Sequence, residues 1–282
     1  MDTSWSRLPL SIDPVLWQGD FFSLAWYGLA FALGVSVALW YFRYILLPAQ
    51  KFFSVLDYAD IVLWGLVGTL LGARLGFVLV YGDDSYWQES WRIISPYDVH
   101  DKIWTGIRGM SFFGGVVGGG LGWWWLARRR HWPFFRLTDM LVQIIPIALG
   151  FGRLGNFLGR ELIGRATEVP WGMYFPSDPT VLRHPSQLYE AFGEGLVLYW
   201  LLRLAASHKV LKPGWLTSFF LIGYGVIRFA LEFFRAPDRG SPLIFSWLTL
   251  NQVLAAGLSV IGTLLFLSFW RRDTIELSKF KL

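Results

Sequence analysis

Residues 59–81 read ADIVLWGLVGTLLGARLGFVLVY. This stretch is long enough for a helix that crosses the hydrocarbon of a bilayer, which takes roughly twenty apolar residues. Six comparable apolar blocks occur along the chain, at about 22–42, 110–127, 139–158, 190–206, 216–235 and 250–270. The sequence therefore predicts an all-α polytopic membrane protein with about seven transmembrane helices, organised as a single integral membrane domain over residues 1–282.

The composition agrees with that prediction. Hydrophobic residues make up 54% of the chain and aromatic residues 18%, which is more apolar surface than a soluble domain of this length requires. The first apolar block follows an acidic segment that contains Asp2, Asp13 and Asp20. A cleavable signal peptide begins with a basic segment instead, so we expect the first block to be a retained span.

Cysteine and net charge narrow the possible functions. The chain has no cysteine, which excludes disulfides, cysteine metal sites and an enzyme thiol as nucleophile. Its net charge of +5 would suggest nucleic acid as a partner of a soluble protein. In a membrane protein we interpret this charge as a topology signal and as contact with anionic membrane lipids, and we expect no nucleic acid partner.

Lysine and arginine outside the blocks predict the orientation. They are more numerous on the side that carries the C-terminus, and Arg128, Arg129 and Arg130 directly follow one block. Because such residues favour the cytoplasmic side, we expect a cytoplasmic C-terminus and an external, periplasmic N-terminus. The connections 82–109 and 159–189 then lie outside, where we expect them to form a small cap with short helices at the interface.

Many glycines lie within the apolar blocks, and we expect most of them to let helices pack closely. Three arginines, Arg74, Arg153 and Arg228, also lie within the blocks. An arginine near the middle of a bilayer costs about 2.5 to 3.5 kcal/mol, so each needs a partner or a wet cavity. They either gather around an anion or have a structural role, snorkelling or pairing with a carboxylate such as Glu232.

The sixth block carries a polar stripe. Arg228, Glu232 and Arg235 are spaced i, i+4 and i+7, so on a helix they share one face. A carboxylate between two guanidinium groups can orient both of them toward a phosphate. Phosphate is the most plausible anion, because every phospholipid headgroup carries one.

A second polar cluster, Gly152–Arg165, lies at the outer end of the fourth block. It places Arg153, Asn156 and Glu161 among glycines. Glycines allow a lipid or a backbone to approach, while the polar side chains supply hydrogen bonds. The cluster is typical of a polar pocket that opens outward, or of a structural cap at a helix end.

These stretches resemble motifs of the prolipoprotein diacylglyceryl transferase family. The resemblance spans residues 14 to 272, nearly the whole chain. Its motifs are Gly152–Arg165, Arg183–Glu190, Trp26–Gly28, Gly109–Phe112 with Gly114 and Gly115, and Tyr224–Arg235 with Pro237 and Asp238.

The resemblance implies an enzyme of the bacterial inner membrane and its substrates. Such an enzyme transfers the diacylglyceryl group of phosphatidylglycerol to the lipobox cysteine in the signal peptide of a prolipoprotein, forming a thioether and releasing glycerol phosphate. The nucleophilic thiol then belongs to the substrate, which agrees with a chain that has no cysteine.

The resemblance also implies the site residues. The catalytic residues it indicates are Tyr27, Arg153, Glu161 and Arg228. The phospholipid-binding residues it indicates are Arg153, Asn156, Gly164, Arg228, Glu232 and Arg235.

One position departs from the family pattern. Phe113 stands where the family commonly has a histidine, often proposed to take the thiol proton. Phenylalanine cannot do this. Either Glu161, Tyr27 or His184 is the base, or no dedicated base is required, or the chain is an altered or inactive paralogue that binds or transports anionic phospholipid.

No metal or nucleotide cofactor is implied. The histidines, His100, His131, His184 and His208, lack the spacing of metal ligands, and no glycine-rich nucleotide loop occurs. His184, which precedes a proline in a loop, is either catalytic or a hydrogen-bonded structural residue.

Overall fold

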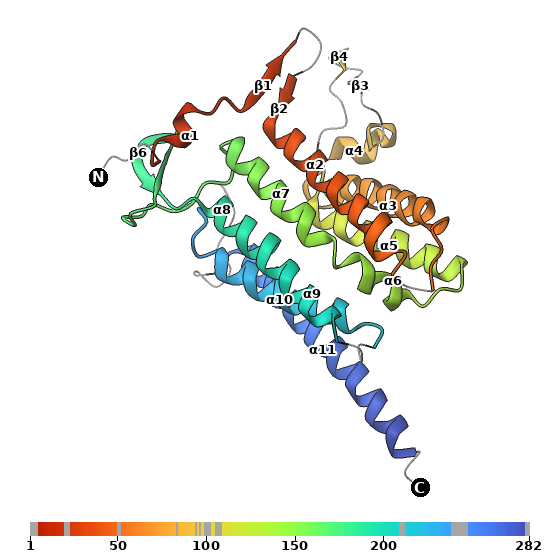
Figure 1. The fold of residues 1–282 in the computed structure, drawn as a ribbon. Coiled ribbons are helices and arrows are strands. Elements are labelled where there is room, and N and C mark those ends of the chain that lie inside the picture. The colour runs from red at the N-terminus through yellow and green to blue at the C-terminus, as the bar shows by residue number, and fades with distance from the viewer. Residues whose placement is uncertain are drawn as a thin grey trace. The chain divides into compact units, whose positions relative to one another are not determined.

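The computed structural model is mostly helical (Figure 1). It describes residues 5–19, 23–49, 52–82, 84–93, 95, 97–98, 103–104, 109–208, 212–237 and 248–279. Within these ranges, four helical stretches are long and apolar enough to cross a membrane, namely Trp26–Leu46, Asp57–Leu79, Phe134–Leu158 and Leu250–Arg271. The prediction of a helical membrane protein is therefore confirmed, whereas seven spans stay a prediction.

Helical structure occurs in each of the seven apolar blocks. In chain order it comprises α2 (Trp26–Tyr41) with the π-helical turn η1 (Phe42–Leu46), α3 (Asp57–Tyr81), α5 (Phe112–Arg129), α6 (Phe134–Leu141) with α7 (Ile145–Leu158), α8 (Ser186–Glu190) with the π-helix η3 (Ala191–Val197) and α9 (Leu198–Ala206), α10 (Trp215–Leu231), and α11 (Leu250–Lys279).

Polar groups and proline mark where several helices begin. The hydroxyl of Ser111 accepts a hydrogen bond from the backbone N–H of Gly114 and caps α5. The carboxylate of Asp139 accepts hydrogen bonds from the backbone N–H groups of Gly214 and Thr217, at 2.6 and 2.8 Å, and so satisfies the start of α10. Pro146 lies in the first turn of α7, where its missing N–H costs nothing.

The chain forms two compact units. The larger contains Met1–Leu46 and Thr138–Leu282, and the smaller contains Leu47–Leu137. Each has its own internal packing, described separately below. The single integral membrane domain predicted over residues 1–282 stays a prediction.

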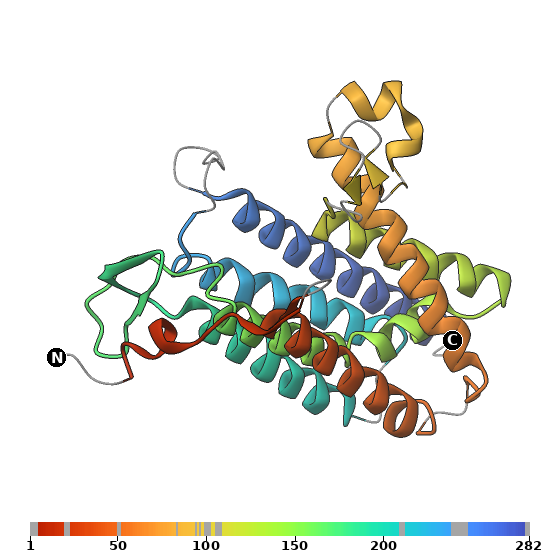
Figure 2. The same cartoon turned by 90° about the horizontal axis from the view of Figure 1, so that it is seen from above.

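In the larger unit, α2 packs against α7, α7 against η3, α9 against α10, and α10 against α11. Figure 2 shows α10 (light blue) and α11 (dark blue) running alongside one another. A buried cluster of Val142, Leu198, Leu202 and Leu216 forms part of the core between them. This packing brings charged side chains from α7, α8, η3 and α10 together.

Two strand pairs and the short helix α1 precede or follow these helices in the larger unit. Strands β1 (Val15–Gln18) and β2 (Ser23–Ala25) pair antiparallel just before α2. Strands β5 (Met173–Phe175) and β6 (Asp178–Arg183) pair antiparallel within the connection 159–189 and lie beside α1 (Leu8–Ser11). Phe157 of α7 is buried with Met173 and Phe175, so this hairpin packs at the end of α7.

The smaller unit is built on close packing of α3 against α5. A Cβ atom on Gly72 would lie 2.6 Å from the Cα atom of Gly118, and one on Gly114 would lie 2.9 Å from the Cα atom of Gly76. The predicted role of these glycines in helix packing is confirmed. Only hydrogen fits between the two backbones here.

The connection 82–109 in the smaller unit contains short elements, as predicted. They are α4 (Asp84–Gln88), the 3₁₀-helix η2 (Ser90–Ile93) and the paired strands β3 (Tyr97–Asp98) and β4 (Ile103–Trp104). The connection 159–189 belongs to the other unit. The external cap formed by both connections therefore stays a prediction.

Candidate active site

Arg228 of α10 makes ion pairs with three carboxylates. Its Nη1 atom lies 2.6 Å from Glu190 Oε1 and 3.3 Å from Glu194 Oε1, and its Nη2 atom lies 2.6 Å from Glu232 Oε2. Its side chain is buried, and so are those of the three glutamates. The guanidinium group therefore links carboxylates from α8, η3 and the end of α10.

Two further arginines join the same carboxylates. Arg153 of α7 donates from Nε to Glu194 Oε2 at 3.1 Å, and its Nη1 atom lies 3.1 Å from Glu190 Oε2. Arg235 Nη1 lies 4.0 Å from Glu190 Oε1. We call Arg153, Arg228, Arg235, Glu190, Glu194 and Glu232 the arginine–glutamate network.

Two glycines allow this arrangement. A Cβ atom on Gly150 of α7 would lie 3.2 Å from the Cα atom of Gly195 in η3, and one on Gly195 would lie 2.7 Å from the Cα atom of Gly150. The two helices thus approach closely one turn before Arg153 and next to Glu194. The turn that carries Glu194 is π-helical, a form that is rare and frequent at functional sites.

Thr249, directly before α11, and Asn251 in its first turn also contact the network. Thr249 Oγ1 and Asn251 Nδ2 each donate a hydrogen bond of 3.0 Å to Glu232 Oε1, while Glu232 Oε2 faces Arg228. Both oxygens of this carboxylate are therefore occupied. Glu232 orients Arg228 and is itself fixed by α11.

The network balances three positive and three negative charges, which accounts for its burial in an apolar helix bundle. An anion cannot simply bind to an arginine that already has a carboxylate partner. A phosphate that enters must replace a carboxylate in part of the guanidinium contacts. The paired carboxylates thus hold the arginines in place.

Asn156 and Glu161 lie together at the end of α7. Asn156 Nδ2 donates to Glu161 Oε2 at 3.1 Å, and the backbone N–H of Glu161 donates to the Asn156 carbonyl at 2.9 Å. The residues on either side of Glu161, Arg160 and Leu162, have φ angles of 59° and 54°, which side chains with a Cβ atom rarely adopt. The loop that presents Glu161 is therefore strained.

Gly164 joins this loop to the end of α10. It forms an isolated bridge with Arg235, and the backbone N–H of Arg165 donates to the Phe234 carbonyl at 2.9 Å. A Cβ atom on Gly164 would lie 2.8 Å from the Cβ atom of His184. Gly164 therefore has no room for a side chain and connects the Glu161 loop to the network.

Tyr27 lies in the first turn of α2, with 40% of its surface exposed. Its ring stacks on Phe31, and its backbone lies against Gly155 of α7. Its hydroxyl makes no hydrogen bond to the residues that the structure describes. The structure thus places Tyr27 beside α7. Among the residues that the structure describes, its hydroxyl makes no hydrogen bond to the network.

His184 belongs to a separate aromatic group. Trp171 Nε1 donates to the Tyr189 hydroxyl at 2.7 Å, and that hydroxyl lies 3.1 Å from His184 Nδ1. Desolvation lowers the pKa of His184 and so favours the neutral imidazole, whose Nδ1 atom can accept a hydrogen bond from the tyrosine hydroxyl. This hydrogen bonding fits the structural interpretation of His184.

Arg74 lies in the smaller unit and has different partners. It donates from Nε to the Ile93 carbonyl at 2.7 Å and from Nη1 to the Gly109 carbonyl at 3.1 Å. Its guanidinium also lies over the rings of Phe77 and Tyr86. Arg74 thus tethers the connection 82–109. This is a structural role, one of the two alternatives considered for the intramembrane arginines.

Comparison with known proteins identifies the family of this site. A family described as prolipoprotein diacylglyceryl transferase matches residues 14–268. A phosphatidylglycerol–prolipoprotein diacylglyceryl transferase from Chlorobaculum tepidum is 38% identical over 274 residues, which cover 92% of each chain. Its counterpart from Wolbachia sp. subsp. Brugia malayi is 39% identical over 92% of this chain and 95% of the relative. The counterpart from Campylobacter lari is 35% identical over 95% of this chain and 97% of the relative.

The chain belongs to the prolipoprotein diacylglyceryl transferase family. The resemblance inferred from the motifs is therefore confirmed. Asp238, one of the motif residues, lies outside the described residues. Phe113 falls in the first turn of α5, and its side chain lies outside the described part of the structure.

Two network residues of this family member were not singled out from the sequence. Glu190 and Glu194 are fully buried, and they bridge Arg153 and Arg228. Their spacing of four residues within the apolar block 190–206 was the available signal, because buried acids in a membrane helix need cations. No three His, Asp or Glu side chains are grouped as metal ligands in the described ranges.

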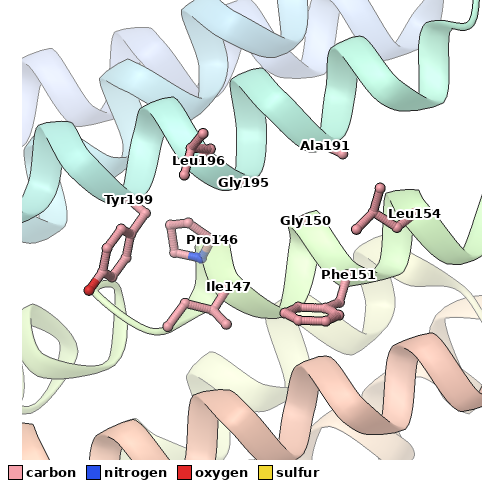
Figure 3. A pocket seen from close by; sticks show the side chains of 9 residues that line it. All are labelled: Pro146, Ile147, Gly150, Phe151, Leu154, Ala191, Gly195, Leu196 and Tyr199. Carbon is pink, nitrogen blue, oxygen red and sulfur yellow. The ribbon is translucent and has the colours of Figure 1, made fainter.

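An apolar groove lies on the neighbouring faces of the same helices (Figure 3). It has a volume of about 260 Å³ and is lined from α7 by residues that include Phe151 and Leu154, and from η3 and α9 by Ala191, Leu196 and Tyr199. Leu154 follows Arg153 in the chain, and Ala191 follows Glu190. The groove therefore begins at the level of the network.

Proposed function

We propose that this protein transfers the diacylglyceryl group of phosphatidylglycerol to the lipobox cysteine thiol of a prolipoprotein. The thiol sulfur forms a bond to the terminal glyceryl carbon, and the bond from that carbon to the phosphate oxygen breaks. Glycerol phosphate leaves with the bonding electrons, and the thiol proton is released. This is the first step of lipoprotein maturation.

The arginine–glutamate network is the observation that carries this proposal. The phosphate of phosphatidylglycerol has one negative charge as a diester and gains a second as it leaves. Arg153 and Arg228, already held by Glu190 and Glu194, exchange carboxylate contacts for phosphate contacts, and so stabilise the charge that develops. Glu232 and Arg235 keep Arg228 oriented.

The Asn156–Glu161 pair serves the thiol. Glu161 is exposed, one of its oxygens accepts from Asn156, and it receives the thiol proton in place of a histidine at position 113. Neighbouring arginines lower the pKa of a bound thiol from about 8.5, so the thiolate becomes more populated. Gly164 holds the loop, and the hydroxyl of Tyr27, a residue with 40% of its surface exposed, is available to donate to a substrate.

The apolar groove beside the network accommodates an acyl chain (Figure 3). A lipid whose phosphate lies at Arg153 would place its glyceryl carbons near Leu154 and Ala191. One chain could then follow the groove toward Tyr199. Burial of apolar chain surface contributes binding energy that is independent of the charges.

The topology proposed for this reaction has seven spans in the bacterial inner membrane. The N-terminus is periplasmic and the C-terminus cytoplasmic. The connections 82–109 and 159–189 form the external cap, beside which phosphatidylglycerol and the prolipoprotein signal peptide meet. The excess of Lys and Arg on the side of the C-terminus supports this orientation.

Mass spectrometry tests the proposal directly. Purified protein in micelles with phosphatidylglycerol and a lipobox peptide should give a peptide that carries one diacylglyceryl group, together with released glycerol phosphate. A peptide with serine in place of the cysteine is the matched control and should remain unmodified.

The alternative function predicts a different result. A paralogue that binds or transports anionic phospholipid would retain phosphatidylglycerol through purification and never consume it. Bound lipid without an adduct, while another family member labels the peptide in parallel, would overturn the transferase proposal.

A further inference from the structure

Gln187 of α8 is a buried amide that is only partly satisfied. The residue has no exposed surface, and its Nε2 atom donates a hydrogen bond of 2.5 Å to the Glu161 carbonyl. Its Oε1 atom is buried and makes no hydrogen bond to the described residues. The atom that faces a carbonyl oxygen must be the NH₂ group, so the free atom is the oxygen.

An acceptor left without a partner in a buried site requires an explanation. The large majority of buried side-chain polar atoms have a hydrogen-bond partner, because leaving one unpaired costs its full desolvation. The amide is planar, and its nitrogen is fixed on Glu161. The direction of the free oxygen is therefore fixed as well, and it is pre-arranged for a donor from another molecule.

The position of Gln187 indicates where that donor comes from. Glu190 lies three residues later on α8, on the same face and about 4.5 Å further along the helix axis. Glu190 contacts Arg153 and Arg228, whereas Gln187 contacts the backbone of Glu161. Gln187 thus connects the loop that carries Glu161 to the helix that carries Glu190, a partner of the proposed phosphate-binding arginines.

We infer that Gln187 Oε1 accepts a hydrogen bond from a hydroxyl of the headgroup glycerol and is a specificity-determining residue. This inference rests on the proposed function. An amide oxygen can only accept, so its partner must be a donor and cannot be a phosphate oxygen. In phosphatidylglycerol the donors nearest the phosphate are the two hydroxyls of the headgroup glycerol. A phosphate at the arginines would leave these hydroxyls about one helical turn away, at the level of Gln187.

The pairing is tested by removing the headgroup hydroxyls from the lipid and, separately, the amide oxygen of Gln187 from the protein. The probe is phosphatidyl-n-propanol, which keeps the phosphate and the three headgroup carbons but has neither hydroxyl. The variants are Gln187→Met, which keeps the side-chain length, and Gln143→Met as a matched control. Gln143 is also buried, and it bonds to the Asp139 carbonyl and to Arg203.

The measured quantity is the ratio of kcat/KM for phosphatidylglycerol to kcat/KM for the analogue. In the native protein we expect a ratio of about ten, the size of one buried hydrogen bond. Gln187→Met should bring the ratio to about one, because the acceptor is gone. Gln143→Met should keep the native ratio.

Each outcome separates this inference from the proposed function. Transfer of neither lipid by the native protein would refute the transferase proposal itself. Equal transfer of both lipids by the native protein, whatever the variants do, would overturn the role of Gln187 while the transferase proposal stands.

A native ratio that Gln187→Met leaves unchanged would also overturn this role. It would assign Gln187 to holding the Glu161 loop alone. If Gln187→Met does not fold, Gln187→Leu removes the same acceptor with a different apolar shape and should also bring the ratio to about one; an unchanged ratio there would count against the inference.

Discussion

Arg228 in the larger unit and Arg74 in the smaller unit are equally well buried, at 7% and 9% exposure, but they are satisfied in different ways. Arg228 is held by three carboxylates. The contacts described for Arg74 include hydrogen bonds to two backbone carbonyls and positions over two aromatic rings. Both arrangements make an arginine tolerable inside an apolar helix.

The difference lies in what each arrangement can exchange. A backbone carbonyl is neutral and belongs to the fold, so Arg74 cannot give up these bonds without loosening the connection that supplies them. A carboxylate is an anion on a side chain, and another anion can take its place at Arg228 with the charge balance largely kept. An arginine paired with carboxylates is therefore suited to bind a phosphate, whereas one paired with carbonyls is suited to hold a loop.

The largest effect is expected from Arg228→Ala. The change removes a phosphate contact and leaves three buried carboxylates without their shared cation, so transfer of the diacylglyceryl group should fall by about 10³-fold or more. The measurement is kcat with phosphatidylglycerol and a lipobox peptide, alongside the amount of protein in the membrane fraction. Arg153→Ala should behave in the same way.

A matched control for these variants is Arg203→Ala. Arg203 lies on α9 and bonds to Gln143, away from the carboxylates of the network. It should keep activity within about threefold. An Arg228→Ala protein that retains more than a tenth of the native rate would remove Arg228 from the proposed mechanism.

Glu194→Gln should have a smaller effect and should strengthen the binding of phosphatidylglycerol. This change leaves the size of the side chain but gives the network one excess positive charge. The anionic headgroup then has one competitor fewer, and KM for phosphatidylglycerol should fall by about fivefold, equivalent to about 1 kcal/mol. The free energy of unfolding should fall by about 1–3 kcal/mol, because hydrogen bonds to a charged group are weakened. A rise in KM would show that Glu194 assists the lipid instead of competing with it.

Much of the fold could be predicted from the sequence, because block length and hydropathy are fixed by the thickness of the bilayer. The break between α6 and α7 and the π-helical turn around Glu194 could not be predicted. The π-helical turn lies where Gly195 packs against Gly150, a contact between residues 45 positions apart in the chain. Block patterns carry no information on such a contact.

For the site, the sequence identified the cations better than their partners. Arg153 and Arg228 are conspicuous because each interrupts an apolar block. The left-handed backbone at Arg160 and Leu162 has no signal, since these residue types seldom adopt it. The orphaned oxygen of Gln187 depends on the tertiary position of Glu161, so only the structure could indicate it.

Arg74→Gln probes the other side of the comparison. Glutamine keeps a donor but loses the fork that reaches the Ile93 and Gly109 carbonyls, so the free energy of unfolding should fall by about 1–3 kcal/mol. Limited proteolysis of the connection 82–109 should become faster, while kcat per folded molecule changes by less than about threefold. Loss of activity at unchanged stability would instead return Arg74 to the anion-binding set considered from the sequence.

The smallest effect is expected from a pair of glycines in α5. Gly118→Ala places a methyl group 2.6 Å from the Cα atom of Gly72, so α3 and α5 must separate, and the free energy of unfolding should fall by about 1–3 kcal/mol. Gly120→Ala, two residues away, meets nothing within 4 Å and should be neutral or stabilise by up to about 1 kcal/mol. Thermal unfolding of both variants in one detergent measures the difference, and kcat per folded molecule should stay native in both. Equal melting temperatures would mean that the contact between α3 and α5 is loose enough to accept a methyl group. The two units would then differ in the chemistry of their buried arginines but not in how tightly their helices pack.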